Sequence, residues 1–265
     1  LRPVAPSTRP DDGAVFSPAG DRLAFLSARA GPREVWLCAP DGTGAVPLTS
    51  LNGAVVGDLH WRPDGRHLAC TVRQDGSVVV GVLDAATGAL TVPERRGRDT
   101  DSQDERCEGW TADGEQVFYA TSRGGAWQLR RRELDGSEDN QVLPDARHLL
   151  YHGGPQGGLW YQRSTGKEIW HQREGDDSAR LAVTGPELGD VLALALRPPR
   201  LYFIRREGPG CVLLRRDLAT GAMDTLAHLP RALGAPLSAA PDGRSFLAVY
   251  LERFEQDLFV AKGFP

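Results

Sequence analysis

The sequence lacks the features that mark a membrane span or a nucleic-acid-binding surface. No run approaches the ~18 uninterrupted apolar residues of a membrane helix, and no signal peptide is visible. The formal net charge is −4, and the short basic runs near Arg95 and Arg131 lie close to acidic residues. We therefore expect neither membrane insertion by this segment nor binding of nucleic acid through it. The sequence begins at Leu1 and its only methionine is Met223, so we expect it to be a piece of a longer protein.

Cysteine is also scarce. The four cysteines, Cys38, Cys70, Cys107 and Cys211, contain no C-x-x-C pair, and no histidine completes a zinc pattern. We expect four free thiols, mostly buried, although the spacing leaves a single disulfide open. Neither a metal ion nor a cofactor is predicted.

Catalytic motifs are missing as well. The sequence has no G-x-S-x-G nucleophile elbow, no P-loop and no G-x-G-x-x-G after a strand. The glycine-rich stretch "GGPQGG" at 153–158 precedes an apolar strand, so it is predicted to form a hairpin turn. These absences predict a protein that is not an enzyme.

What the sequence does contain is a repeat. The stretch "WRPDGRHLAC" at Trp61 resembles "FSPAGDRLAF" at Phe16, "WTADGEQVFY" at Trp110 and "AAPDGRSFLA" at Ala239. The first three recur about every 45 residues, and the last gap leaves room for two further units. "LRPPRLYF" at Leu196 looks like one of these units with its glycine lost, and the other is expected near "GGPQGG".

A second landmark gives the number of units. Apolar strands recur without a gap at Trp36, Val80, Trp127, Trp170, Leu213 and Leu258. Tight-turn dipeptides such as Asp41-Gly42 and Thr220-Gly221 follow most of them. Each unit therefore reads as four short strands, which is typical of a propeller blade. The prediction is one all-β domain over 1–265, a six-bladed β-propeller of four-stranded antiparallel blades at about 11–50, 55–95, 104–144, 148–184, 190–228 and 235–262 with 1–6.

The last unit ends after its third strand. We therefore expect residues 1–6 to pair with residues 257–262 and complete the blade. In the second unit the four strands are predicted at 55–61, 67–72, 77–83 and 90–93.

Two sets of residues are candidates for a site. Polar residues open the predicted first strands, beside an axial channel: Asp11, Asp12, Asp58, His60, Glu105, Arg106, His152 and Asp190. They could bind a cation or a polar ligand, or simply line a water-filled channel. Arginines of the loops between second and third strands form a possible ring for a protein or anionic partner: Arg29, Arg33, Arg73, Arg123, Arg206 and Arg253.

The repeat carries a family resemblance. "FSPAGDRLAFLSARAGPREVWLCAPDGTGAVPLT" resembles the TolB-like propeller repeat, with Trp61, Pro63, Asp64 and Gly65 matching its turn. The first repeat departs from this turn with Ala19 in place of the Asp, and the third with Ala112 in place of the Pro. The closing segment "LSAAPDGRSFLAVYLERFEQDLFVAKGFP" resembles that of propellers fused behind a winged-helix domain in bacterial CadC-like regulators.

The resemblance implies a role and a location. It implies a sensory or protein-binding domain of a membrane-tethered transcriptional regulator, on the periplasmic or extracytoplasmic side. A stand-alone TolB-like periplasmic scaffold is an alternative, and so is a propeller enzyme of the lactonase or lyase kind with a channel metal. The residues themselves leave a cytoplasmic location open.

Overall fold

β-Strands supply nearly all of the regular structure. The computed structural model describes residues 2–93, 104–123, 126–152, 158–163, 167–229, 233–252 and 255–262. These residues form six four-stranded antiparallel sheets and one short helix, α1 (Gly185–Leu188). None of the described residues belongs to a helix long and apolar enough to cross a membrane. The sheets are divided between two compact units, Leu1–Pro47 with Pro186–Pro265 (unit 1) and Leu48–Gly185 (unit 2).

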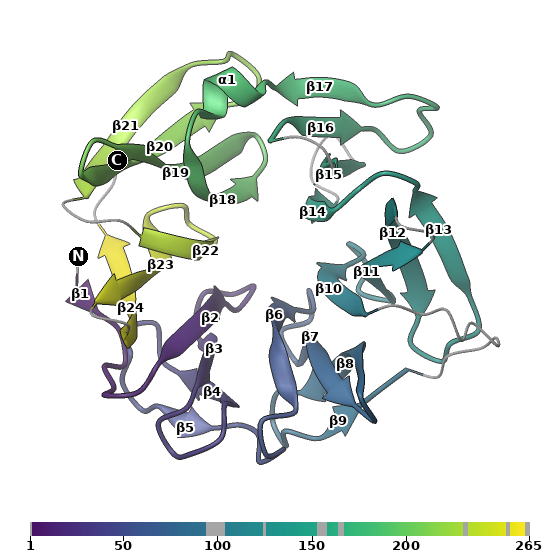
Figure 1. The fold of residues 1–265 in the computed structure, drawn as a ribbon, viewed down its shortest axis with the longest axis vertical. Coiled ribbons are helices and arrows are strands. Elements are labelled where there is room, and N and C mark those ends of the chain that lie inside the picture. The colour runs from purple at the N-terminus through teal and green to yellow at the C-terminus, as the bar shows by residue number, and fades with distance from the viewer. Residues whose placement is uncertain are drawn as a thin grey trace. The chain divides into compact units, whose positions relative to one another are not determined.

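Unit 1 holds three sheets whose first strands lie side by side in the order β18, β22, β2 (Figure 1). Sheet 1 consists of β2 (Asp11–Phe16), β3 (Leu23–Ser27), β4 (Glu34–Cys38) and β5 (Val46–Pro47). Sheet 5 consists of β18 (Val191–Arg197), β19 (Arg200–Glu207), β20 (Gly210–Asp217) and β21 (Met223–Leu229). Sheet 6 consists of β22 (Leu233–Ala239), β23 (Ser245–Glu252), β24 (Glu255–Lys262) and β1 (Arg2–Pro3).

Unit 2 holds the other three, with first strands in the order β6, β10, β14. Sheet 2 consists of β6 (Val55–Trp61), β7 (His67–Gln74), β8 (Ser77–Asp84) and β9 (Leu90–Thr91). Sheet 3 consists of β10 (Glu105–Trp110), β11 (Gln116–Arg123), β12 (Ala126–Glu133) and β13 (Asp139–Leu143). Sheet 4 consists of β14 (His148–His152), β15 (Leu159–Gln162), β16 (Ile169–Gln172) and β17 (Arg180–Val183).

The predicted strands of the second repeat are confirmed to within two residues at each end. "LRPPRLYF" joins β18 to β19 through Pro198-Pro199, whose peptide bond is cis. Most of "GGPQGG" lies outside the described residues, but β14 and β15 flank it and pair as a hairpin. The single domain and its ring of six blades stay predictions.

One turn chemistry recurs in four sheets. In sheets 1, 2, 3 and 6 the glycine of the turn donates its N–H to the carbonyl three residues earlier, as Gly65 does to Arg62 and Gly114 to Thr111. These glycines have φ values of +66° to +76°, the left-handed region that side chains disfavour. Asp64 Oδ1 also accepts the N–H of Arg66 at 2.7 Å, and Asp242 does the same for Arg244 at 2.8 Å. The recurring Asp-Gly pair therefore supplies both the backbone conformation and its hydrogen bond.

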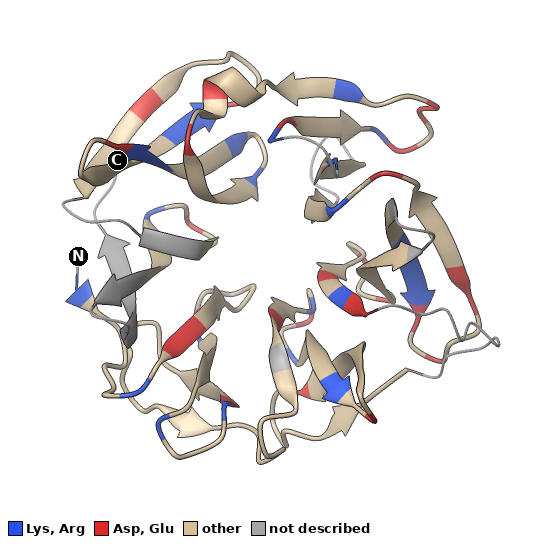
Figure 2. Ribbon diagram, viewed as in Figure 1, with Lys and Arg blue, Asp and Glu red and all other residues tan. Residues whose placement is uncertain are grey.

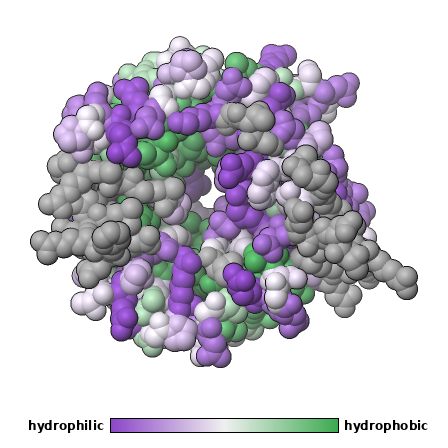
Figure 3. All heavy atoms as spheres, in the orientation of Figure 1, coloured by the Kyte–Doolittle hydropathy of each residue, from purple (hydrophilic) through white to green (hydrophobic). Residues whose placement is uncertain are grey.

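Apolar cores lie between neighbouring sheets. One core joins Val80 and Val82 of sheet 2 to Cys107, Trp110 and Tyr119 of sheet 3. All four cysteines are free and buried, which confirms the prediction. On the face drawn in Figure 3, hydrophilic residues predominate outside the grey atoms. The large hydrophobic residues exposed among the described ones, Val46, Leu181 and Met223, lie on fourth strands of three different sheets, so each is an isolated surface residue.

The N-terminal segment completes sheet 6 as predicted. Arg2 pairs with Val260 and Pro3 with Phe259, so β1 is the fourth strand beside β24. The next residues, Val4 and Ala5, are buried in the core that contains Phe16 and Trp36 of sheet 1. The segment therefore ties sheet 6 to sheet 1.

This tie predicts unequal effects of two alanine substitutions in one turn. A Cβ on Gly42 would lie 2.4 Å from the backbone nitrogen of Ala5, whereas a Cβ on Gly44 would meet nothing within 4 Å. Both glycines have positive φ, so the two variants share the backbone strain. Gly42→Ala should lower the free energy of unfolding by about 1–3 kcal/mol more than Gly44→Ala, measured by urea unfolding. Equal losses would show that the N-terminal segment does not pack on this turn.

Candidate functional site

In unit 1 the two predicted sets of site residues pair with each other. Asp11 opposes Ser27 in the ladder between β2 and β3, which brings Arg29 back beside it. Arg29 Nη2 lies 2.6 Å from Asp11 Oδ2 and donates to the carbonyl of Ala5 at 2.6 Å. Its guanidinium also lies over the rings of Phe25 and Trp36. Asp11 is 1% exposed, so this pair is an internal contact, and the placement of Arg29 in an open ring is corrected.

Two further pairs join the two predicted sets. Arg33 forms an ion pair with Asp12, and Arg206 Nε lies 3.2 Å from Asp190 Oδ2. These arginines are therefore at least partly neutralised by the first strand of their own sheet. Arg73 is exposed on β7. The side chains of Arg123 and His152, and all of Arg253, lie outside the described residues.

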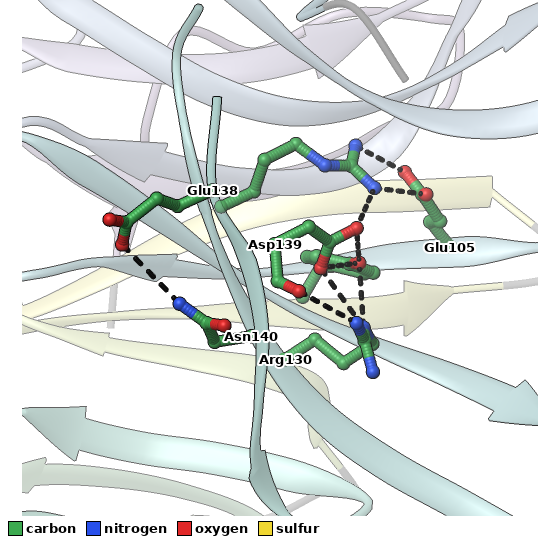
Figure 4. A network of polar contacts seen from close by, with 7 residues as sticks. Glu105, Arg130, Glu138, Asp139 and Asn140 are labelled. Carbon is green, nitrogen blue, oxygen red and sulfur yellow. Dashed lines mark hydrogen bonds and ion pairs between the residues drawn. The ribbon is translucent and has the colours of Figure 1, made fainter. Parts of the chain in front are cut away.

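Glu105 belongs to a buried network in sheet 3 (Figure 4). Its carboxylate accepts hydrogen bonds from Arg132 Nη2 at 2.7 Å and from the backbone N–H of Val80 at 3.2 Å. Arg132 Nη2 also reaches Asp139 Oδ2 at 3.3 Å, and Tyr119 donates to Asp139 at 2.6 Å. Burial raises the pKa of Tyr119 to about 12. Glu105 and Arg132 are each 3% exposed, so Glu105 holds sheets 2 and 3 together instead of opening into a channel as predicted.

A second polar cluster lies along the first strands of unit 2. We call Asp58, His60, Arg106, Glu108 and His148 the β6–β10–β14 cluster; the succession of acidic and basic residues on β10 is visible in Figure 2. Glu108 Oε1 lies 2.7 Å from Arg106 Nε and 3.8 Å from His148 Nδ1. Its Oε2 accepts the backbone N–H of Leu149 on β14 at 2.9 Å. Glu108 therefore bridges sheets 3 and 4.

Burial shifts the titration of this cluster. It raises the pKa of Glu108 to about 7, although the charge of Arg106 acts in the opposite direction. Burial, together with the charges of Arg106 and Arg147, lowers the pKa of His148 to about 4. Burial also lowers the pKa of His60, and the charge of Asp58 opposes that shift. Perturbed groups gathered in this way are typical of functional sites.

Asp58 occupies an unusual backbone position. The register of β6 against β7 shifts on both sides of Gly57, and Asp58 has a φ of +55°. Thr71 Oγ1 donates to Asp58 Oδ2 at 2.7 Å and accepts the N–H of Cys107 at 3.0 Å. The hydroxyl of Thr71 therefore fixes the Asp58 carboxylate and joins sheets 2 and 3. Bulges of this kind redirect a side chain out of the regular alternation.

The prediction from sequence found three members of this cluster and missed two. Asp58, His60 and Arg106 were predicted, whereas Glu108 and His148 were not. Alternation along "ERCEGW" places Arg106 and Glu108 on one face, which could have revealed Glu108. His148 is the first residue of β14, where the predicted fourth blade also begins. Among the described residues, no group of three His, Cys, Asp or Glu side chains lies close enough together to hold a metal ion.

The fold has known relatives, although no family model matches the chain. It is 26% identical over 137 residues to a Protein TolB homolog of Chlorobium chlorochromatii; the match covers 50% of this chain and about a third of that protein. The structure of a putative TolB from Agrobacterium tumefaciens matches 98% of this chain and 92% of its own, with a TM-score of 0.66 and 15% identity. An oligogalacturonate lyase in complex with manganese matches 99% of this chain and 90% of its own, with a TM-score of 0.61 and 15% identity. The chain thus has a TolB-like β-propeller fold with four-stranded antiparallel blades.

The buried network predicts a large loss of stability for Glu105→Gln. The change leaves the guanidinium of Arg132, 3% exposed, without its closest carboxylate. The free energy of unfolding, from urea titration, should fall by about 3 kcal/mol. The control is Asp224→Asn, because Asp224 is 56% exposed and pairs with Arg215 at 2.8 Å; it should cost less than about 1 kcal/mol. Similar losses in the two variants would contradict a structural role for Glu105.

The pKa of Glu108 predicts the pH dependence of stability. The pKa of Glu108 in the folded chain, about 7, exceeds the ordinary 4.5. The stability that Glu108 contributes is therefore present below about pH 4.5 and is lost as the pH rises through 7. As the pH rises from about 5 to about 7.5, the free energy of unfolding of Glu108→Gln should therefore increase relative to that of the natural chain, by up to roughly 3 kcal/mol.

His148→Gln should show the opposite trend. The folded pKa of His148, about 4, is below its ordinary 6.5, so its contribution rises with pH between these values. The variant should therefore lose stability relative to the natural chain as the pH rises through this range. Urea unfolding at several pH values checks both variants, and differences that do not change with pH would contradict the two assignments.

Proposed function

We propose that the chain is a non-catalytic binding module and that the β6–β10–β14 cluster is its contact surface for a protein partner or a small polar ligand. The observation that supports this proposal is the gathering of Asp58, His60 and Glu108 with two further charged or titratable residues on three neighbouring first strands. Clefts and faces with several perturbed polar groups are the usual places of recognition.

Binding is favoured over catalysis by the way Glu108 is held. A general base needs a free oxygen for the proton that it removes. Both oxygens of Glu108 are engaged, Oε1 with Arg106 and Oε2 with the N–H of Leu149. The likeness to an oligogalacturonate lyase concerns the fold, and the proposal transfers no chemistry from it.

For the wider role we propose an extracytoplasmic sensory domain of a membrane-tethered transcriptional regulator. The closing segment that ends in "QDLFVAKGFP" supports this role by its resemblance to CadC-like regulators. The similarity to a TolB homolog supports the alternative, a stand-alone periplasmic scaffold. The upstream part of the gene separates the two, because the regulator requires a winged helix and an apolar helix of about 20 residues before the propeller.

Site-directed photocrosslinking tests the contact surface. A benzophenone amino acid replaces Arg147, which is exposed next to His148, or Met223, which is 40% exposed on β21 of sheet 5. Both variants are expressed from the full-length gene in cells of the source organism and irradiated.

A defined cross-linked species from position 147, and none from position 223, is the expected result. Cross-linking from position 223 alone would move the contact surface to the outer strands and overturn the proposal.

A further inference from the structure

We propose that Asp58 receives a cationic side chain, Lys or Arg, of the protein partner. The inference rests on the proposed function and names the chemistry of its partner. It departs from the sequence-based prediction of an arginine ring for an anionic partner. The reason is the distribution of charges that stay unpaired.

Among the described residues, four arginines of the two predicted sets have carboxylate partners, and Arg73 has none. Arg29 and Arg206 have carboxylate partners in their own sheets. Arg106 binds Glu108 through Nε and donates from Nη2 to the carbonyl of Arg147. An anionic partner that bound these arginines would have to displace these contacts.

The carboxylate of Asp58 is differently placed. Asp58 is exposed, and among the residues that the structure describes its one hydrogen-bond partner is Thr71, which contacts Oδ2. No cation lies within ion-pair distance of it in this part of the chain. An exposed carboxylate held in one orientation recognises a guanidinium or ammonium group at a reduced entropic cost.

The repeat shows that the fold does not require a carboxylate there. Asp58 lies three residues before Trp61, and Gly13 lies three residues before the corresponding Phe16. Both adopt positive φ at a break in register, +55° and +63°. Glycine is the residue that this conformation favours, so Asp58 carries a backbone cost that a glycine would avoid. Its hydrogen bond to Thr71 offsets part of that cost.

The described neighbours of Asp58 on β6 and β7 do not pair with its carboxylate as cations. Burial keeps His60 neutral near physiological pH, so the imidazole offers hydrogen bonds and no positive charge. Arg73 lies two residues beyond Thr71 and therefore on the same face of β7. It makes no ion pair with Asp58 among the described residues, and its charge acts at longer range.

Titration with two small probes tests the sign of the charge that is recognised. The 265-residue chain, labelled with ¹⁵N, is titrated with Nα-acetylarginine amide or with Nα-acetylglutamate amide at constant ionic strength. We expect the amide signals of Asp58 and His60 to shift and saturate with the arginine probe only.

Three variants sharpen the test. Asp58→Asn keeps a residue that tolerates positive φ and removes the charge, so it should weaken binding of the arginine probe about fivefold. Asp75→Asn is the control, because Asp75 is also exposed with positive φ (+49°) and should leave binding unchanged. Arg73→Ala removes the competing cation and should strengthen binding.

The outcomes separate this inference from the proposed function. Binding of the glutamate probe, or of neither probe, overturns the cationic partner even when cross-linking from position 147 succeeds. Equal weakening by Asp58→Asn and Asp75→Asn overturns it too, since any surface carboxylate would then serve. Saturable binding of the arginine probe without cross-linking from position 147 leaves the cation site standing and removes the proposed function.

Discussion

The structure depends on how backbone N–H groups are satisfied where two sheets meet. Neighbouring sheets share no ladder, so these donors need an acceptor from outside their own sheet. Side-chain oxygens supply it: Thr71 accepts the N–H of Cys107, Glu105 that of Val80, and Glu108 that of Leu149. Leaving such a donor unpaired in a buried position costs about 1–3 kcal/mol. Several polar residues at the first strands therefore have a structural role, whether or not they also bind a partner.

This constraint explains why the predicted site residues divide as they do. From the sequence, Glu105 was predicted to be a charged residue at the start of a first strand, but its partners come from β8 and β12. Asp11 and Arg29 are separated by 17 intervening residues and become partners because β2 and β3 are antiparallel and in register. A list of charges along a sequence does not contain these pairings, because each depends on register and on bulges.

The fold itself was largely predictable, and the reason is local. The Asp-Gly turns close each hairpin through contacts within a few residues, so "WRPDGRHLAC" fixes the ends of β6 and β7 without reference to the rest of the chain. The pairing of β1 with β24 followed from a missing fourth strand. The breaks in register at Asp58 and Glu108 were not predicted, because the alternation of side chains does not mark where a strand bulges.

Departures from the repeat are therefore the informative positions. Gly109 lies one residue before Trp110, as His60 lies one residue before Trp61, and a Cβ on Gly109 would be 3.6 Å from the His60 ring. The ring of His60 thus occupies space that the next sheet leaves open. Asp58 stands where sheet 1 has Gly13, at a positive φ that glycine adopts more easily than aspartate. Asp58 and His60 are thus departures from the repeat within unit 2, and the proposed recognition by its first strands rests on them.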